Sequence, residues 1–510
     1  MLTITAAELA AITHGRLSAT AAPLAVIGLG NIVTDSRESF PGAVYVAKPG
    51  EFSDGHAFIP AAVAAGAVLV IAERDTTDDG GTAHPAVIVE DAVLALGALA
   101  AHVVRRIRAA GELTVIAITG SAGKTTTKDL LAGILSASAA TVAPTGSFNG
   151  EVGVPLTVFR ADESTRYLVI EMGATRLGHI SYLCSLVRPD IGVVLGVGSA
   201  HTGEFGGVDN IATAKGELVE ALAATGAAVL NADDARVAAM AARGPAPVTY
   251  FGRAEGPASA KPGARVLASD AATDQDGHPV FGLSFSAEPD AGTAQVRSGL
   301  LGEHHLANLL GAAAAAHLAG IPAAAITAGL DGRGPASRWR MELTERADGI
   351  TVINDAYNAN PDSMRAALRT LAELGSGPHP RRTWAVLGPM YELGADSVRE
   401  HDLLGRVAVR LNISRLVVVG AEARAMHVGA VMEGSWGDES VFVADLEEAH
   451  ELLRRELRAG DIVLVKSSNA ANLRYLGDRI ALRSVVTDGQ GQQGAAASEQ
   501  GTDGERTRDQ

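Results

Sequence analysis

The 510-residue sequence has very little cysteine, since Cys184 is the single one. One cysteine excludes a disulfide within the chain and a zinc-finger framework. Because Cys184 lies in an apolar helical run, we expect it to be a core residue. Positive charge is also scarce: 42 Lys and Arg face 58 Asp and Glu, for a formal net charge of −16. So acidic a surface repels nucleic acids and anionic lipids, which leaves only a local basic pocket for an anionic substrate.

The sequence also lacks the patterns of export and membrane insertion. Met1–Arg16 has no basic region followed by an apolar run, as a secretory signal would require. The longest uncharged stretch, Leu306–Leu330, is mostly alanine and is interrupted at Gly320–Pro322. It predicts two helices joined by a turn, not a membrane span. We therefore expect a cytoplasmic protein without a membrane span.

Short apolar runs rich in β-branched residues alternate with helical stretches, which is typical of parallel sheets in α/β proteins. The expected strands are Val44–Ala47, Ala67–Ala72, Leu113–Ile118, Tyr167–Ile170, Ile191–Val197, Ala227–Leu230, Thr351–Ile353, Trp384–Leu387, Leu416–Val419 and Ile462–Val465. Loops and antiparallel strands are expected over Gly252–Gly299. The chain is too long for one core, and we predict domains at 1–112, 113–335 and 336–486 with a disordered tail at 487–510.

The clearest motif is a glycine-rich loop between a strand and a helix. The expected strand Leu113–Ile118 leads into Thr119–Thr127, and a helix is expected from Asp129. This arrangement aims backbone N–H groups at a phosphate; Lys124 would reach the β- and γ-phosphates, and the hydroxyl of Thr125 would bind Mg²⁺. The usual spacing puts a first glycine where Ile118 stands, so only Gly-Lys-Thr of the consensus is present. The loop alone fits a motor, a kinase or a ligase.

Polar side chains follow the next two expected strands. Glu171 comes directly after Tyr167–Ile170, and His201 comes shortly after Ile191–Val197. The carboxyl ends of parallel strands carry ligands in open α/β sheets. Carboxylate oxygens and imidazole are suitable ligands for a metal ion beside a triphosphate, so both residues are candidates for it. Lys215 is expected on a helix further along.

Taken together, these residues resemble the Mur ligases, the ATP-dependent amide ligases of peptidoglycan precursor synthesis. The resemblance runs from about residue 30 to about residue 480 and is carried by Thr119–Thr127, Glu171–Ala174, His201, Lys215 and Asp355–Met364. The string Asp355–Met364 resembles the members that add D-alanyl-D-alanine to UDP-N-acetylmuramoyl-tripeptide. The implied fold has a central P-loop parallel-sheet ATPase domain and a Rossmann-like C-terminal α/β domain.

The resemblance implies a cofactor set, substrates and residue roles. ATP with Mg²⁺ would drive amide formation through an acyl phosphate, in a protein expected to be a monomer. The metal ligands would be Thr125, Glu171, His201 and a carbamylated Lys215. Lys124 and Arg338 would supply positive charge during phosphoryl transfer. The implied nucleotide site consists of Thr119, Gly120, Ser121, Ala122, Gly123, Lys124, Thr125, Thr126, Asn308, Arg338, Asp355 and Asn358, with Asp355 near the ribose or the γ-phosphate.

The same resemblance assigns a substrate to each domain. Residues 1–112 would bind the UDP end of the substrate, 113–335 would bind ATP, and 336–486 would bind the amine. The residues implied for the UDP-linked substrate are Ser36, Arg37 and Asn149.

Two other classes of protein share some of these features. Another Mur ligase or a folylpolyglutamate synthase-like ligase would share the phosphate loop, but the Asp355–Met364 string speaks against both. A P-loop protein that uses ATP as a conformational switch would leave the metal set unexplained. Meso-diaminopimelate and lysine both stay open as the third residue of the peptide substrate.

Overall fold

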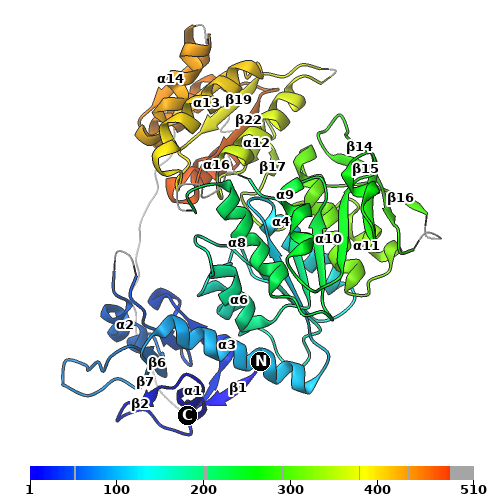
Figure 1. The fold of residues 1–510 in the computed structure, drawn as a ribbon. Helices are drawn as coiled ribbons and strands as arrows, with labels where there is room; N and C mark the ends of the chain where they lie inside the picture. Colours follow the sequence, from blue (N-terminus) through cyan, green and yellow to red (C-terminus); the bar gives the residue numbers. More distant parts are fainter. Residues whose placement is uncertain (51–52, 199–204, 289–291, 378, 435–436, 483–510) are drawn as a thin grey trace, which may run out of the picture.

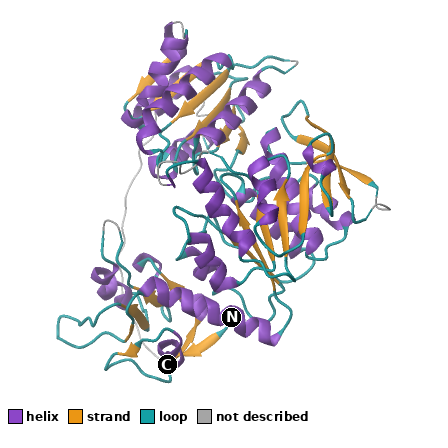
Figure 2. Ribbon diagram, viewed as in Figure 1, coloured by secondary structure: helices purple, strands orange, loops and turns teal. Residues whose placement is uncertain are grey.

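The computed structural model describes residues 1–50, 53–198, 205–288, 292–377, 379–434 and 437–482. Three α/β domains follow one another along the chain, and the central domain lies between the other two (Figure 1). Helices flank the sheets of all three (Figure 2). This architecture confirms the predicted α/β class with three domains.

The N-terminal domain is built on a five-stranded sheet of order β2-β7-β6-β5-β4. Adjacent strands of this sheet are parallel, except that β2 and β7 are antiparallel. Strands β1 and β3 form a separate antiparallel pair. The elements are β1 (Thr3–Thr5), α1 (Ala6–Ile12), β2 (Arg16–Leu17), β3 (Val26–Gly28), β4 (Ile32–Val33), β5 (Val44–Val46), α2 (Ile59–Ala64), β6 (Leu69–Ala72), β7 (Ala86–Ile88) and α3 (Ala92–Ala110).

The central domain holds a nine-stranded sheet of order β16-β15-β14-β13-β12-β11-β8-β10-β9, which is parallel from β9 to β14 and antiparallel beyond. Its strands are β8 (Thr114–Thr119), β9 (Thr141–Val142), β10 (Tyr167–Glu171), β11 (Ile191–Val194), β12 (Ala227–Asn231), β13 (Val248–Arg253), β14 (Arg265–Thr273), β15 (Pro279–Phe285) and β16 (Thr293–Arg297). Its helices include α4 (Lys124–Ser136), α5 (Gly153–Val158), α6 (His179–Val187), α8 (Val208–Glu220), α9 (Ala235–Ala239), α10 (Leu306–Leu318) and α11 (Ala323–Leu330).

The C-terminal domain has a six-stranded sheet of order β17-β18-β22-β19-β20-β21, in which only the edge strand β17 runs antiparallel to its neighbour. Its strands are β17 (Glu342–Glu345), β18 (Thr351–Asn354), β19 (Thr383–Leu387), β20 (Arg415–Val419), β21 (Ser440–Val443) and β22 (Ile462–Lys466). Its helices are α12 (Pro361–Gly375), α13 (Ser397–Arg410), α14 (Arg424–Glu433), α15 (Leu446–Glu456) and α16 (Leu473–Ala481).

Helix α3 attaches the N-terminal domain to the central one. The Asp91 carboxylate accepts hydrogen bonds from the amides of Val93 and Leu94 and so caps its first turn. Further along, Gly97 lies against Tyr182 of α6, where a Cβ atom would come 2.4 Å from the phenol oxygen. The buried face of α3 belongs to one apolar core that continues into the central sheet. The two domains therefore share a packed interface.

The structure confirms several predicted elements and alters others. The alanine-rich stretch forms the two helices α10 and α11, and Cys184 is buried in α6. Strand β11 ends at Val194, earlier than predicted, because the amide of Val197 donates to the Asp234 carboxylate instead of to a neighbouring strand. Strand β21 was not predicted. The predicted domain bounds stay predictions, and the tail at 487–510 lies outside the described residues.

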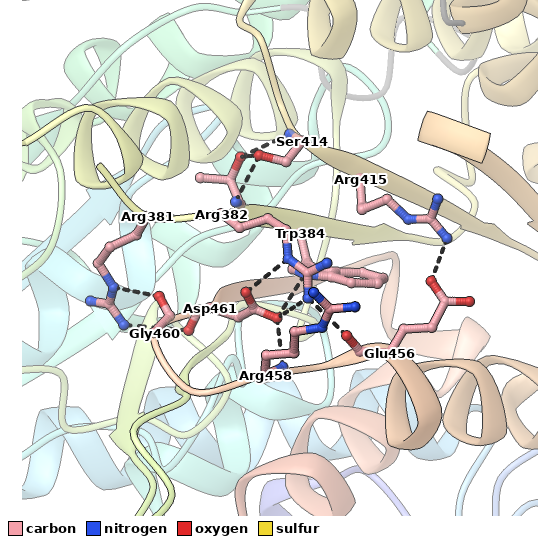
Figure 3. Close-up of polar contacts among 10 residues, drawn as sticks. Arg381, Arg382, Trp384, Ser414, Arg415, Glu456, Arg458, Gly460 and Asp461 are labelled. Carbon is pink, nitrogen blue, oxygen red and sulfur yellow. Dashed lines mark hydrogen bonds and ion pairs between the residues drawn. The ribbon is translucent and has the colours of Figure 1, made fainter. Parts of the chain in front are cut away.

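A charged cluster lies where strands β19 and β22 of the C-terminal sheet begin (Figure 3). The Asp461 carboxylate accepts hydrogen bonds from Arg382 Nε at 2.9 Å and Nη2 at 2.7 Å. It also accepts from the indole N–H of the fully buried Trp384 at 3.1 Å and from the amide of Arg458 at 2.8 Å. The guanidinium groups of Arg382 and Arg415 lie 5.0 Å and 5.3 Å from the Trp384 ring centroid. Asp461 is thus the shared acceptor of the cluster.

We expect Asp461→Ala to destabilise the C-terminal domain by about 3 kcal/mol, because it leaves a buried indole N–H and a guanidinium without their acceptor. The measurement is urea unfolding followed by tryptophan fluorescence. As a control in the same domain, Asp396→Ala removes a carboxylate that is 55% exposed and paired with Arg399 at 3.5 Å, which should cost less than about 1 kcal/mol. Equal midpoints for the two variants would contradict this role of Asp461.

Candidate active site

The predicted phosphate loop connects β8 to α4, in the strand–loop–helix order expected from the sequence. Gly123 has a φ of 83° and precedes the first residue of α4, Lys124. A Cβ atom at Gly123 would come 2.0 Å from Oδ1 of Asn308 on α10, so this position has no room for a side chain. The close packing brings Asn308, which was predicted at the nucleotide, against the loop.

Lys124 folds back into the loop, and its ammonium donates to the carbonyl of Gly120 at 2.9 Å. Burial is the main cause of a lowered pKa at Lys124; the carboxylate of Glu171 opposes this shift, and the charge of Arg340 adds to it. A cation held in this way is poised to gain an anionic partner.

Glu171 ends β10 and is 1% exposed. Strands β8 and β10 are parallel neighbours, which brings Glu171 to the same edge of the sheet as the phosphate loop. Its carboxylate accepts from the hydroxyl of Thr125 at 2.9 Å and from the amide of Asn149 at 2.8 Å. The Thr125 hydroxyl also lies 2.7 Å from that of Ser147. Three predicted site residues thus form one hydrogen-bonded group.

Lys215 lies on helix α8, as predicted, and its side chain is buried. Burial, with a further contribution from the charge of Lys124, lowers its pKa to about 7. His201 lies outside the described residues. Among the residues that are described, no group of three or more His, Cys, Asp or Glu side chains could hold a metal ion.

A cavity of about 510 Å³ opens between the phosphate loop and the C-terminal domain. The predicted residues that line it are Ser121, Ala122, Gly123, Lys124, Thr125, Thr126, Asn149, Glu171, Asn308, Asp355 and Asn358. Thr119 and Gly120 lie in the strand and turn that lead into the loop and do not line it. The structure therefore gathers most of the predicted nucleotide site around one space.

The C-terminal domain adds residues that sequence reasoning missed. The ammonium of the buried Lys466 donates to the Asp355 carboxylate at 2.5 Å and to the carbonyl of Asn358 at 3.1 Å. Arg340 also lines the cavity, and its Nη2 donates to the hydroxyls of Thr125 at 3.2 Å and Ser147 at 3.1 Å. Arg340 stands two residues after Arg338, and nothing in the sequence set it apart from Arg338.

Arg338 does not join this group. Its side chain is 59% exposed, and its Nη2 donates to Asp478 of α16 at 2.9 Å. Ser36 and Arg37 lie in a short 3₁₀ turn of the N-terminal domain and do not line the cavity either. Hydrogen bonds from Arg37 lower the pKa of Asp35 to about 2, and Arg37 itself is 87% exposed.

No helix among the described residues is both long and apolar enough to cross a membrane.

Comparison with known proteins gives one family for three successive parts of the chain. Residues 29–112 match the Mur ligase family catalytic domain, 118–316 the Mur ligase middle domain, and 339–469 the Mur ligase glutamate ligase domain. The chain is 46% identical to the UDP-N-acetylmuramoyl-tripeptide–D-alanyl-D-alanine ligase of Mycobacterium leprae, over 88% of this chain and 92% of that protein. It is 33% identical to the ligase of the same name from Escherichia coli, over 92% and 97%.

Solved structures agree with the sequence matches. A crystal structure of MurF from Acinetobacter baumannii superposes with a TM-score of 0.80 at 30% identity, covering 95% of this chain and 100% of that one. The MurF ligase of Thermotoga maritima in complex with ADP gives a TM-score of 0.70 at 26% identity, covering 89% and 99%. Because successive parts of the chain match all three family domains and the chain is 46% identical to a member over 88% of its length, it belongs to the Mur ligase family.

Proposed function

We propose that this chain is an ATP-dependent amide ligase that joins D-alanyl-D-alanine to UDP-N-acetylmuramoyl-tripeptide. The observation that carries this function is 44–46% identity, over 88% of the chain, to mycobacterial ligases named for that reaction. The cavity beside the phosphate loop supports it, because Lys124 and the start of α4 suit a nucleotide phosphate. The ADP in the Thermotoga maritima relative supports an adenine nucleotide as the occupant.

Amide formation from a carboxylate and an amine is uphill in water, so the carboxylate must first gain a better leaving group. In the proposed reaction the substrate carboxylate attacks the terminal phosphorus of ATP, which gives an acyl phosphate and releases ADP. The amine of D-alanyl-D-alanine then attacks the acyl carbon, and phosphate leaves. Phosphoryl transfer depends mainly on positioning and charge neutralisation. Lys124 would supply positive charge at the β- and γ-phosphates, and Arg338 was predicted to add to it.

The residues present suit a magnesium ion. Mg²⁺ at a nucleotide is bound by one or two carboxylates together with phosphate oxygens and water, so a cluster of three acidic side chains is not required. The Thr125 hydroxyl and the Glu171 carboxylate, 2.9 Å apart, form such a donor pair. His201 and a carbamylated Lys215 would complete it. When bound, the ion would neutralise charge on the phosphate oxygens.

The remaining assignments are proposals of the same kind. Asn308 and Asn358 would contact the nucleotide, with Asp355 near its ribose or γ-phosphate. Ser36, Arg37 and Asn149 would contact the UDP-linked substrate. Residues 1–112, 113–335 and 336–486 would bind that substrate, ATP and the amine in turn, in a cytoplasmic monomer.

The function is tested by phosphate release from ATP in the presence of UDP-N-acetylmuramoyl-tripeptide, with and without D-alanyl-D-alanine. Both forms of the tripeptide, with meso-diaminopimelate or lysine, are supplied separately. We expect release to require both substrates, and the product mass to increase by one dipeptide. Release with a different amine would indicate another ligase of the family, and release without any amine would indicate a switch.

Carbamylation of Lys215 is expected to depend on pH. Carbon dioxide reacts only with the neutral amine, forming an N–C bond and releasing a proton. With a pKa of about 7, Lys215 is mostly protonated at pH 6 and mostly neutral at pH 8.5, so the carbamate should form at the higher pH. ¹³C NMR of the protein in labelled bicarbonate measures this, with Lys215→Gln as the control. The same carbamate signal in wild type and Lys215→Gln would contradict the prediction.

A further inference from the structure

We propose that the ion pair of Glu151 and Arg176 recognises the side chain of the third residue of the peptide substrate, and that this residue is meso-diaminopimelate. The inference rests on the proposed function, which leaves meso-diaminopimelate and lysine open at this position. The two side chains differ at their far end, where lysine carries an ammonium alone and diaminopimelate carries an ammonium and a carboxylate.

Two loop segments lie side by side at the carboxyl end of strand β10. The backbone amide of Gly173 donates to the carbonyl of Asn149 at 2.8 Å, and the Asn149 side chain donates to Glu171 at 2.8 Å. Glu151 follows Asn149 by two residues, and Arg176 follows Gly173 by three. Arg176 Nη2 donates to Glu151 Oε1 at 2.8 Å. The ion pair thus joins the two segments next to the residues that line the phosphate end of the cavity, without lining it.

The ion pair lies on the side of the central domain that faces the N-terminal domain. Helix α6 begins three residues after Arg176 and packs against α3, the helix that attaches the N-terminal domain (Figure 1). Burial raises the pKa of Tyr182 on α6, and the carboxylates of Glu151 and of Asp91, the cap of α3, add to this shift. A substrate whose UDP end is held by residues 1–112 and whose carboxylate reaches Lys124 therefore passes along this side.

The length of the substrate side chain fits this place. In the proposed reaction the carboxylate of the third residue reacts beside Lys124 and Glu171. From Asn149, which contacts Glu171, two residues of chain span at most about 7 Å to Glu151. The side chain of diaminopimelate, with three methylene groups between its two ends, is of the same order of length. Its far end can therefore meet the ion pair while its reacting carboxylate is at the phosphate.

The ion pair offers the groups that a zwitterionic chain end needs. Glu151 can accept hydrogen bonds from an ammonium, and the planar guanidinium of Arg176 can donate to a carboxylate. The Arg176 side chain is 71% exposed and that of Glu151 is 33% exposed, so a ligand can reach both. Within the described part of the chain, Arg176 forms no other ion pair. Exposed pairs contribute little to stability, so exchanging this one for two pairs with a ligand costs the fold little.

A histidine beside the ion pair has unused hydrogen-bonding capacity. The His179 side chain is 12% exposed, its Nε2 lies 3.4 Å from Glu151 Oε1, and neither ring nitrogen has a hydrogen-bond partner among the described residues. Burial lowers the pKa of His179; Arg176 adds to this shift, and Glu151 and Glu217 oppose it. The ring is therefore neutral at pH 7 and can donate to a carboxylate or accept from an ammonium. Diaminopimelate supplies partners for all three side chains, whereas lysine leaves Arg176 without one.

The test measures kcat/KM of the full-length chain for three forms of UDP-N-acetylmuramoyl-tripeptide at saturating ATP and D-alanyl-D-alanine. The third residue is meso-diaminopimelate, lysine, or meso-diaminopimelate amidated at its far carboxylate, which keeps the size and loses the charge. We expect the wild type to prefer diaminopimelate over both others by about 10-fold or more, the effect of a charge-assisted hydrogen bond. Arg176→Ala should abolish this preference by slowing the reaction of diaminopimelate alone, and Arg176→Lys should keep part of it. Glu151→Gln should lower kcat/KM for all three forms, because each carries the ammonium, and the KM for ATP should not change in any variant.

The matched control is Arg236→Ala, which removes another exposed ion pair of the central domain. Arg236 is 54% exposed and pairs with Asp209 at 3.4 Å, and its loss should leave the preference for diaminopimelate intact. A wild type that uses the lysine form equally well, or an Arg176→Ala variant that keeps the full preference, would overturn the inference. Calorimetry with the same three tripeptides measures the preference without turnover. A wild type that binds the diaminopimelate form preferentially but makes no product with D-alanyl-D-alanine would refute the proposed ligase function and support the role of the ion pair.

Discussion

Replacing Lys124 by alanine is expected to reduce turnover by about 1,000-fold or more while leaving the protein folded. Lys124 is the first residue of α4, its ammonium stays inside the phosphate loop, and it lines the cavity. Phosphoryl transfer is catalysed mainly by neutralising charge on the phosphates, so a lost cation at this position affects the transition state directly. Turnover is measured as phosphate release with both substrates present.

A second lysine on the same helix provides the control. Lys128 is also buried, but its ammonium donates to the carbonyl of Pro144 at 2.8 Å and pairs with Asp129 at 2.5 Å, and it does not line the cavity. Lys128→Met should therefore lower stability and leave turnover per folded molecule near that of the wild type. Full activity of Lys124→Ala would refute the assignment of the nucleotide site.

The sequence predicted the central sheet well where strands are continuous apolar runs. Tyr167–Ile170 and Ala227–Leu230 lie in strands β10 and β12, and their parallel order follows from the helices between them. The strand Ser440–Val443 was missed because it lies at the edge of its sheet, where its two middle residues are only partly buried, so it differs less from a loop than the fully buried interior strands do. The end of β11 was placed too late, since a hydrogen bond to Asp234, distant in sequence, draws Val197 out of the ladder.

Part of the candidate site could likewise be predicted from the sequence, and part of it could not. Lys124, Thr125 and Glu171 could be placed together because parallel strands end at one edge of a sheet. The pairing of Lys466 with Asp355 joins residues 111 apart in the chain, and no local pattern indicates it. Arg340, and not Arg338, reaches the phosphate loop because Trp339 and Met341 have positive φ angles. Tryptophan and methionine seldom adopt such angles, so the sequence does not predict this conformation.

Glu171→Gln is expected to have the second large effect, through the metal ion. Glutamine is nearly the same size and keeps one oxygen acceptor, and the Thr125 hydroxyl can turn to Ser147 at 2.7 Å, so the fold should be retained. Among the described residues, Glu171 is the one carboxylate that accepts from Thr125, and the substitution removes its negative charge. We expect turnover to fall on the order of 100-fold and the Mg²⁺ concentration for half-maximal rate to rise. Replacing even a residue that only hydrogen-bonds to a metal ligand lowers metal affinity or activity by roughly 10–100-fold. Asn149→Ala, which removes the amide donor to Glu171 but keeps the carboxylate, should change the Mg²⁺ requirement less.

The same substitution also predicts a shift in pH dependence that a purely structural role of Glu171 would not give. The Glu171 carboxylate holds up the pKa of Lys124 against burial and Arg340, so its removal lowers that pKa further. Because a protonated Lys124 is needed at the phosphates, the alkaline limb of the rate profile should move to lower pH in Glu171→Gln. Turnover across a pH series at saturating Mg²⁺ measures this. An unchanged alkaline limb, together with an unchanged Mg²⁺ requirement, would mean that Glu171 supports the loop through its hydrogen bonds alone.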